Sequence, residues 1–192
     1  ESEVLCGFDM LVGTSSLVKQ KKWRHTYLFS GESTLKCSKD QYTCVLWGER
    51  NHHNVVNVPL FIPYIYCNQF DNVLETKQEI TTIPNDDICV IISNPRGKER
   101  TLFLNELEKE FNVCYAGEYK NNMGETLKPQ YNTKEYQSFV NQFKFIISME
   151  NSIEDTYITE KLINGLVSNI IPVYWGSDNV HDYINSERFL NL

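Results

Sequence analysis

The 192-residue sequence lacks an apolar run approaching the roughly 18 to 20 residues needed to span a bilayer. It also has no surplus of basic side chains, since 18 Lys and Arg residues against 25 Asp and Glu residues give a net charge of −7. This balance argues against a nucleic-acid partner and against binding to an anionic membrane surface. A negative net charge still allows a local basic pocket that binds one anionic ligand.

Metal-binding and disulfide patterns are missing as well. No two of the six cysteines have CxxC spacing, and no Asn-x-Ser/Thr sequon occurs. We predict free thiols, with a Cys37–Cys44 bridge as the alternative. His52 and His53 are adjacent but lack a third ligand at a regular spacing, so we predict no metal site. These features favour a reducing, non-secretory compartment.

The start of the chain resembles neither a signal peptide nor a complete N-terminus. Glu1-Ser2-Glu3 has no basic start and no apolar core, and the first residue is not Met. A strand-like run begins almost at once, at Val4. We therefore expect a piece of a longer protein, and any membrane anchor would lie outside it.

The middle and second half predict an α/β fold. Expected strands cover residues 4–6, 26–29, 43–46, 88–92, 112–115, 143–148 and 171–175, and expected helices cover 98–111, 133–141 and 156–168. Their alternation after residue 86 predicts a parallel sheet with helices on its faces. We place a boundary within residues 75–86, between a smaller unit at 1–80 and a second unit at 86–192. Residues 58–63 contain two prolines and are expected to cross between the units.

One segment has the arrangement of a phosphate-binding site. An apolar strand ends at Ser148, a polar turn follows, and we expect a helix to start near Thr156 with Asp155 or Thr156 as its N-cap. Such a turn presents unpaired N–H groups at the carboxyl edge of a sheet. The helix would carry Tyr157, Glu160 and Lys161 on one face. An ordinary surface helix also has a polar face, so this pattern alone does not decide its role.

Three blocks of sequence resemble a known family. Glu150-Asn151-Ser152, Tyr157-Ile158-Thr159-Glu160-Lys161-Leu162 and Ile171-Pro172-Val173-Tyr174-Trp175-Gly176 look like the signature of α-1,3/1,4-fucosyltransferases, glycosyltransferase family 10. The spacing between the blocks matches too. The resemblance implies a GT-B fold, in which two Rossmann-like domains face a cleft. Family members extend further at both ends, so the N-terminal domain and the C-terminal end are expected to be truncated here.

The resemblance also assigns a donor site for GDP-fucose. Asn151, Tyr157, Glu160 and Lys161 would line it. Arg100 follows Ser93-Asn94-Pro95 by five residues, as does a diphosphate-binding Arg in the family. Arg96 and Lys98 are interpreted as solvated charge. No Asp-x-Asp motif occurs, which favours a route without a metal or other cofactor.

The general base would come from the other unit. Tyr27-Leu28-Phe29-Ser30-Gly31-Glu32 is similar to the family segment in which a Glu after Gly deprotonates the acceptor hydroxyl. Glu32 is therefore the expected base for inverting transfer of fucose from GDP-β-L-fucose to a GlcNAc-containing oligosaccharide or glycoprotein. An α-1,3 linkage is favoured, although no residue distinguishes it from α-1,4.

Two other hypotheses remain. The chain could be a non-catalytic GDP-sugar-binding fragment, or a GT-B enzyme that uses another donor sugar. A complete chain would be expected in the cytoplasm. A fragment of an anchored eukaryotic-type enzyme would be expected on the lumenal side of the Golgi membrane.

Overall fold

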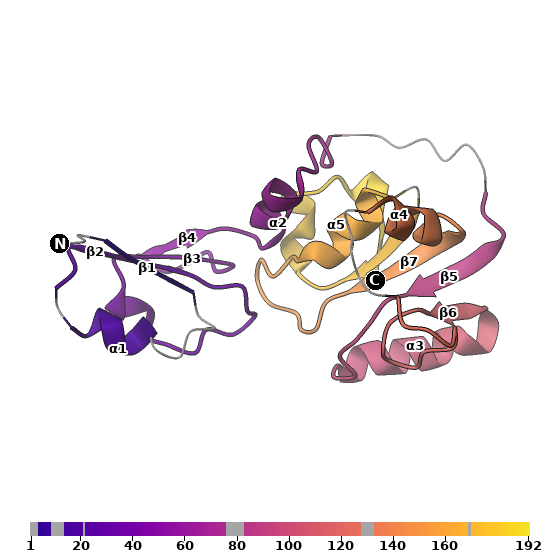
Figure 1. Cartoon of the computed structure of the whole chain (residues 1–192), viewed down its shortest axis with the longest axis horizontal. Helices are drawn as coiled ribbons and strands as arrows, with labels where there is room; N and C mark the ends of the chain where they lie inside the picture. Colours follow the sequence, from indigo (N-terminus) through magenta and orange to yellow (C-terminus); the bar gives the residue numbers. More distant parts are fainter. Residues whose placement is uncertain (1–3, 9–13, 21, 76–82, 128–132, 169) are drawn as a thin grey trace.

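The computed structural model describes residues 4–8, 14–20, 22–75, 83–127, 133–168 and 170–192. Its strands form two parallel sheets, one of four strands and one of five, which lie at opposite ends of the long axis (Figure 1). The predicted α/β class is therefore confirmed. Within the described residues, no helix is both long and apolar enough to cross a membrane.

The first sheet has the order β1-β2-β3-β4. Its strands are β1 (Val4–Phe8), β2 (His25–Phe29), β3 (Cys44–Trp47) and β4 (Val55–Asn57), and the short helix α1 (Thr14–Val18) connects β1 to β2. The buried residues Leu28, Tyr42 and Val45 form its core. The sequence predicted the first three strands but missed β4, because three residues are too short for a recognisable alternation.

The second sheet has the order β6-β5-β7-β8-β9, and each pair of neighbouring strands is parallel. Its strands are β5 (Asp86–Val90), β6 (Val113–Tyr115), β7 (Phe143–Met149), β8 (Ile171–Trp175) and β9 (Leu190–Asn191). The chain moves from β5 outward to β6 and then returns to β7 on the other side of β5. The carboxyl ends of β5 and β7 thus form a topological switch point, where open α/β sheets bind ligands.

Helices cover both faces of the second sheet, as predicted. Ile147 and Met149 of β7 pack with Leu104 of α3 (Lys98–Glu110) on one face. Ile146 of β7 packs with Tyr136 of α4 (Lys134–Val140) on the opposite face. Adjacent residues of β7 therefore point to opposite sides, and both sides are apolar because both are buried.

Helix α5 (Glu160–Leu166) begins later than predicted. Thr159, and neither Asp155 nor Thr156, is its N-cap, and the Thr159 side chain accepts from the backbone N–H of Lys161. The backbone N–H of Thr156 instead donates to the carbonyl of Gly48 in the first sheet's unit, at 3.1 Å. This contact between the two units holds residues 156–158 outside the helix, so Tyr157 precedes α5.

The predicted crossing at residues 58–63 was only partly correct, because helix α2 (Phe61–Asn68) begins within it. Phe61 is fully buried and packs with Leu162 of α5. Pro63 lies in the first turn of α2, where a missing N–H costs no helical hydrogen bond. The predicted boundary at 75–86 includes residues 76–82, which lie outside the described residues, so the division into units stays a prediction. All six cysteines are free thiols.

Candidate active site

The two loops at the switch point are joined by a contact between predicted site residues. Nη1 of Arg100, in the first turn of α3, donates to Oδ1 of Asn151, which follows β7, at 2.9 Å. The sequence pointed to these residues separately, from motifs about fifty positions apart. Their contact places both at the carboxyl edge of β5 and β7, where a phosphorylated ligand is expected.

Arg100 is a buried cation that is held in a fixed orientation. It is 3% exposed, and its Nη2 donates to the carbonyls of Asn94 and Arg96 at 2.6 and 2.5 Å. Burial lowers the pKa of Arg100, but a guanidinium stays protonated at all ordinary pH values. These contacts use three of its five N–H groups. Arg96 and Lys98 are exposed, in agreement with their interpretation as solvated charge.

Glu150 is the residue that the sequence interpretation missed. Its side chain is fully buried and lies at the end of β7. Oε1 accepts from the backbone N–H of Thr159 at 2.8 Å, and Oε2 accepts from Nζ of Lys161 at 3.0 Å. One carboxylate thus closes the loop of residues 150–159 at both ends. The available signal was an acidic residue directly after an apolar strand, because a carboxylate there needs buried partners.

The ion pair of Glu150 and Lys161 determines the protonation state of the groups beside the loop of residues 150–159. Burial alone would lower the pKa of Lys161, but the carboxylates of Glu150 and Glu160 outweigh it and raise that pKa well above its ordinary value. Burial raises the pKa of Glu150, and Lys161 and Thr159 oppose this shift. Lys161 therefore remains an ammonium group at neutral pH. Glu150 also lies near enough to Arg100 to oppose part of the lowering of the guanidinium pKa that burial causes.

The ammonium of Lys161 is not presented freely to a ligand. Besides Glu150, it contacts Oγ1 of Thr159 at 2.9 Å and Oε1 of Glu160 at 3.5 Å. The contact with Glu160 is the longest of the three, and Glu160 is only partly buried. A phosphate oxygen could replace that contact without breaking the buried pair.

A cavity of about 400 Å³ lies where the two units meet. Glu32, which follows β2, and Tyr157, which precedes α5, both line it. The carboxylate of Glu32 is near enough to contribute to the raised pKa of Tyr157, for which burial is the largest cause. The structure therefore brings the predicted base of the first unit together with a predicted donor-site residue of the second.

Glu32 is positioned by neighbours from its own sheet. Nε1 of Trp47, the last residue of β3, donates to the carbonyl of Glu32 at 2.8 Å. The Oγ of Ser30, which is fully buried, accepts from the backbone N–H of Glu32 at 3.3 Å. These bonds fix the backbone at Glu32, an exposed residue that belongs to the cavity lining. Trp47 also lines the cavity and offers an aromatic wall.

Hydrogen bonds that join β4 and the start of α2 to the loop before α5 keep this cavity assembled. The side-chain amide of Asn57 donates to Oγ1 of Thr156 at 2.6 Å, and the backbone N–H of Phe61 donates to the carbonyl of Ile158 at 3.0 Å. Tyr183 donates its hydroxyl to Oδ1 of Asn57 at 2.7 Å. The loop that carries Tyr157 is thus bonded to β4 before Tyr157 and to the start of α2 after it.

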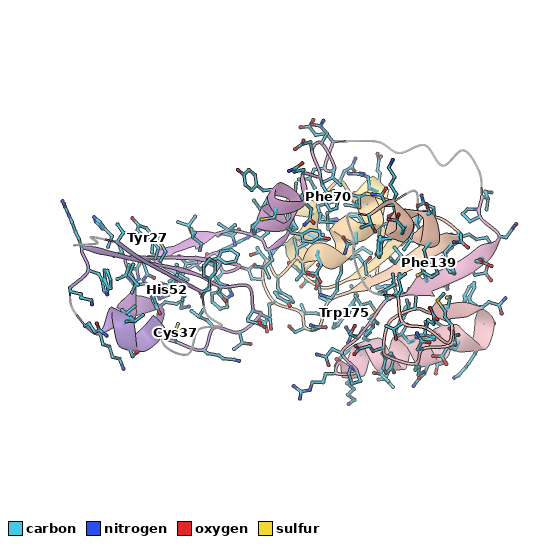
Figure 2. The ribbon with its side chains drawn as sticks, viewed as in Figure 1. Tyr27, Cys37, His52, Phe70, Phe139 and Trp175 are labelled. Carbon is cyan, nitrogen blue, oxygen red and sulfur yellow. The ribbon has the colours of Figure 1, made fainter. Side chains whose placement is uncertain are left out.

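A larger cavity, of about 530 Å³, lies elsewhere. Its lining includes Asp86, Asn112 and Phe143, which stand at or next to the amino ends of strands in the second sheet. That edge is opposite to the one where parallel sheets bind their ligands. We therefore assign the site to the smaller cavity and the adjacent switch point. Trp175, the last residue of β8 and the register partner of Met149, lies at the same carboxyl edge of the sheet (Figure 2).

Comparisons with known proteins agree with these features. The sequence model described as "Glycosyltransferase family 10 (fucosyltransferase) C-term" matches residues 82–192. An α-(1,3)-fucosyltransferase of Helicobacter pylori is 34% identical over 102 residues, which are 53% of this chain and 20% of that protein. The human 4-galactosyl-N-acetylglucosaminide 3-α-L-fucosyltransferase 9 is 26% identical over 140 residues, which are 71% of this chain and 35% of that protein. The chain thus spans a fifth to about a third of these relatives.

Solved structures share the fold. A crystal structure of an α1,3-fucosyltransferase superposes with a TM-score of 0.77 at 20% identity, over 98% of this chain and 61% of that one. Another, of an α1,3-fucosyltransferase with GDP-fucose, has a TM-score of 0.70 at 16% identity and covers 99% of this chain and 73% of that one. The likeness extends over both sheets, which confirms the predicted GT-B type of fold. The family model matches more than half of the length of this chain. The chain therefore belongs to glycosyltransferase family 10, the fucosyltransferases.

Proposed function

We propose that this chain, alone or as part of a longer protein, transfers L-fucose from GDP-β-L-fucose to a sugar hydroxyl with inversion at the anomeric carbon. The observation that carries this proposal is the shared cavity of Glu32 and Tyr157. Glu32, which follows β2, and Tyr157, which precedes α5, line the same space of about 400 Å³. Inversion requires a base on the side of the fucose away from the leaving nucleotide, and Glu32 would be that base.

The donor diphosphate would lie at the carboxyl ends of β5 and β7. Arg100 offers its two remaining N–H groups there, and Asn151 fixes the guanidinium by the 2.9 Å contact. Lys161 would exchange its 3.5 Å contact with Glu160 for a phosphate oxygen. Glu160 would then be free to accept hydrogen bonds from hydroxyls of the ribose or the fucose.

In the chemical step, Glu32 takes the proton of the acceptor hydroxyl. The acceptor oxygen forms a bond to the anomeric carbon as the bond from that carbon to the β-phosphate oxygen breaks. The electron pair of the broken bond leaves with GDP. The developing phosphate charge is stabilised by Arg100 and Lys161, which are already oriented and largely shielded from water. No step in this sequence requires a metal ion.

The acceptor would occupy the cavity beside Trp47. An indole face suits the apolar face of a pyranose, and Glu32 lies in the same cavity. The name of the human relative specifies a 4-galactosyl-N-acetylglucosaminide acceptor and a 3-α-L-linkage. We propose a GlcNAc-containing glycan and an α-1,3 linkage for this chain by that similarity.

The test is a transfer assay with labelled GDP-fucose and N-acetyllactosamine. We expect a fucosylated product, an increase in the melting temperature with GDP, and undiminished transfer in EDTA. UDP-sugars should neither stabilise the protein nor act as donors. No thermal response to GDP would refute the proposed donor site, and a strict Mn²⁺ requirement would refute the metal-free step.

A second candidate function is binding of the GDP-sugar without transfer. It is favoured by the contrast between Arg100, which is buried and held by three contacts, and Glu32, which is exposed. GDP would then raise the melting temperature while no fucosylated product forms. The same assay therefore separates the two candidates.

A further inference from the structure

Three metal-binding side chains come together in the first unit, away from the reaction site. Asp40 lies in the 3₁₀ turn of Lys39–Gln41, and His52 and His53 lie in the loop between β3 and β4. Their ligand atoms all lie within 4.8 Å of one another. Figure 2 shows His52 in the smaller lobe, far along the long axis from Trp175.

Hydrogen bonding within the cluster does not account for this convergence. The Nε2 atoms of His52 and His53 lie 3.8 and 3.9 Å from Oδ1 of Asp40, which is too long for a hydrogen bond. Nδ1 of His52 is buried, and no hydrogen-bond partner for it exists among the described residues. The stacked rings of His52 and His53, whose centroids lie 4.6 Å apart, thus approach the Asp40 carboxylate without a hydrogen bond to it.

These distances suit a small divalent ion. With zinc bonds of about 2.0 to 2.2 Å to nitrogen and oxygen, neighbouring ligands of a tetrahedral ion lie about 3.3 to 3.5 Å apart. The two separations from Asp40, 3.8 and 3.9 Å, exceed this by about half an ångström, and all three ligand atoms lie within 4.8 Å of one another. A small rotation of exposed side chains closes that difference, and Asp40 and His53 are 70% and 77% exposed.

The backbone segments that carry the three ligands are held together by one side chain. The amide of Asn54 donates to the carbonyls of Lys39 and Tyr42, at 2.7 and 3.0 Å, and so caps the turn that contains Asp40. Asn54 directly follows the two histidines in the sequence. The carboxylate and the imidazoles are thus brought into place without a metal, as a preorganised site requires.

We propose that Asp40, His52 and His53 bind one Zn²⁺-class ion, with open positions left for water. Two imidazoles and a carboxylate are a ligand set that first-row transition metals accept and that Mg²⁺ and Ca²⁺ do not prefer. The ion would join the turn of Lys39–Gln41 to the β3–β4 loop, which also supplies Glu49 and Asn51 to the cavity lining. It would stabilise that loop and take no part in the transfer step. The site does not depend on the proposed transferase activity.

The test titrates metal-free protein with Zn²⁺ in a calorimeter and follows its melting temperature. We expect one equivalent to bind and the melting temperature to rise. Asp40→Asn and His53→Ala should each weaken binding by at least about tenfold, because even outer-shell changes cost that much. Both side chains are exposed, so these variants should fold.

Two controls separate this site from other zinc-binding groups. His181→Ala removes a histidine outside the cluster, and Cys37→Ser removes a free thiol of the same unit. Both should bind Zn²⁺ as the wild type does. The proposal is overturned if the wild type takes up no Zn²⁺, if Asp40→Asn and His53→Ala bind it unchanged, or if Cys37→Ser abolishes binding.

Discussion

Nη1 of Arg100 lies 2.9 Å from Oδ1 of Asn151, so a buried guanidinium bonds the loop after β5 to the loop after β7. The two strands are neighbours at the switch point of the second sheet. A diphosphate placed there would meet a fixed cation without the cost of ordering a long side chain.

Replacing Arg100 by Lys should weaken GDP binding. Lysine keeps the charge but cannot reach two carbonyls, Asn151 and a phosphate at the same time. We expect GDP affinity to fall by roughly tenfold to a hundredfold, equivalent to about 1.5 to 3 kcal/mol for a hydrogen bond to a charged group. Isothermal titration with GDP measures the change.

Lys98→Ala is the matched control, because Lys98 is an exposed cation in the same turn of α3. Its affinity for GDP should stay within about twofold of the wild type. A loss of affinity in Lys98→Ala together with unchanged affinity in Arg100→Lys would show that net positive charge, and not the placement of Arg100, determines binding. Circular dichroism of Arg100→Lys verifies that the buried position still folds.

The buried pair of Glu150 and Lys161 should show strong coupling. Glu150→Gln leaves a largely buried ammonium without its carboxylate, and we expect a loss of roughly 2 to 3 kcal/mol in the free energy of unfolding. This lies below the range for fully buried pairs because the side chain of Lys161 is 25% exposed. Urea denaturation of Glu150→Gln, Lys161→Met and the double variant gives the coupling energy. Additive losses would contradict a direct pair.

The same pair predicts a dependence of stability on alkaline pH. The folded pKa of Lys161 lies above its ordinary value of 10.5, so its stabilising contribution is complete below pH 10.5 and is lost as pH rises through the folded pKa. Tyr42, whose pKa burial raises to about 12, also lowers stability above pH 10 in every variant. The difference between wild type and Lys161→Met isolates the lysine. That difference should shrink above pH 10.5, and a constant difference would contradict the pairing.

Gly97 should tolerate no side chain. It precedes α3 with a φ of 126°, which L-residues rarely adopt, and its carbonyl accepts from the backbone N–H of Thr101. Gly97→Ala should cost about 1 to 3 kcal/mol in thermal or urea unfolding. It should also weaken GDP binding, because the backbone here positions Arg100. Gly31→Ala is a suitable control for the added methyl group, since no other atom lies within 4 Å of the place that this group would take. Equal stability of both variants would argue against strain at Gly97.

Much of the second sheet was predictable from the sequence. Strands β7 and β8 are apolar runs buried on both faces, and α3 has an apolar stripe, so local patterns carried enough information. The start of α5 was not predictable in this way. Residues 156–158 have a helix-like pattern, but contacts with Gly48, Asn57 and Phe61 in distant segments hold them in a loop.

The candidate site was likewise predictable from the sequence only in part. Arg100, Asn151, Glu160, Lys161 and Glu32 could be named from motifs, because the family resemblance supplies their positions. The contacts among these residues could not be predicted from motifs. Arg100 with Asn151, and Glu32 with Tyr157, belong to segments that only the folded chain brings together. The proximity of Asp40 to His52 and His53 could not be predicted for the same reason, because Asp40 lies twelve positions before His52 in the sequence.

The most direct test of the account compares transfer by Glu32→Gln and Glu154→Gln. Both carboxylates line the cavity, but only Glu32 is assigned as the base. With saturating GDP-fucose and N-acetyllactosamine, Glu32→Gln should lose roughly a hundredfold to ten-thousandfold in kcat, while its thermal stabilisation by GDP is unchanged. Glu154→Gln should transfer within about twofold of the wild type. Full transfer by Glu32→Gln, or equal losses in both variants, would contradict the assignment of Glu32 as the general base.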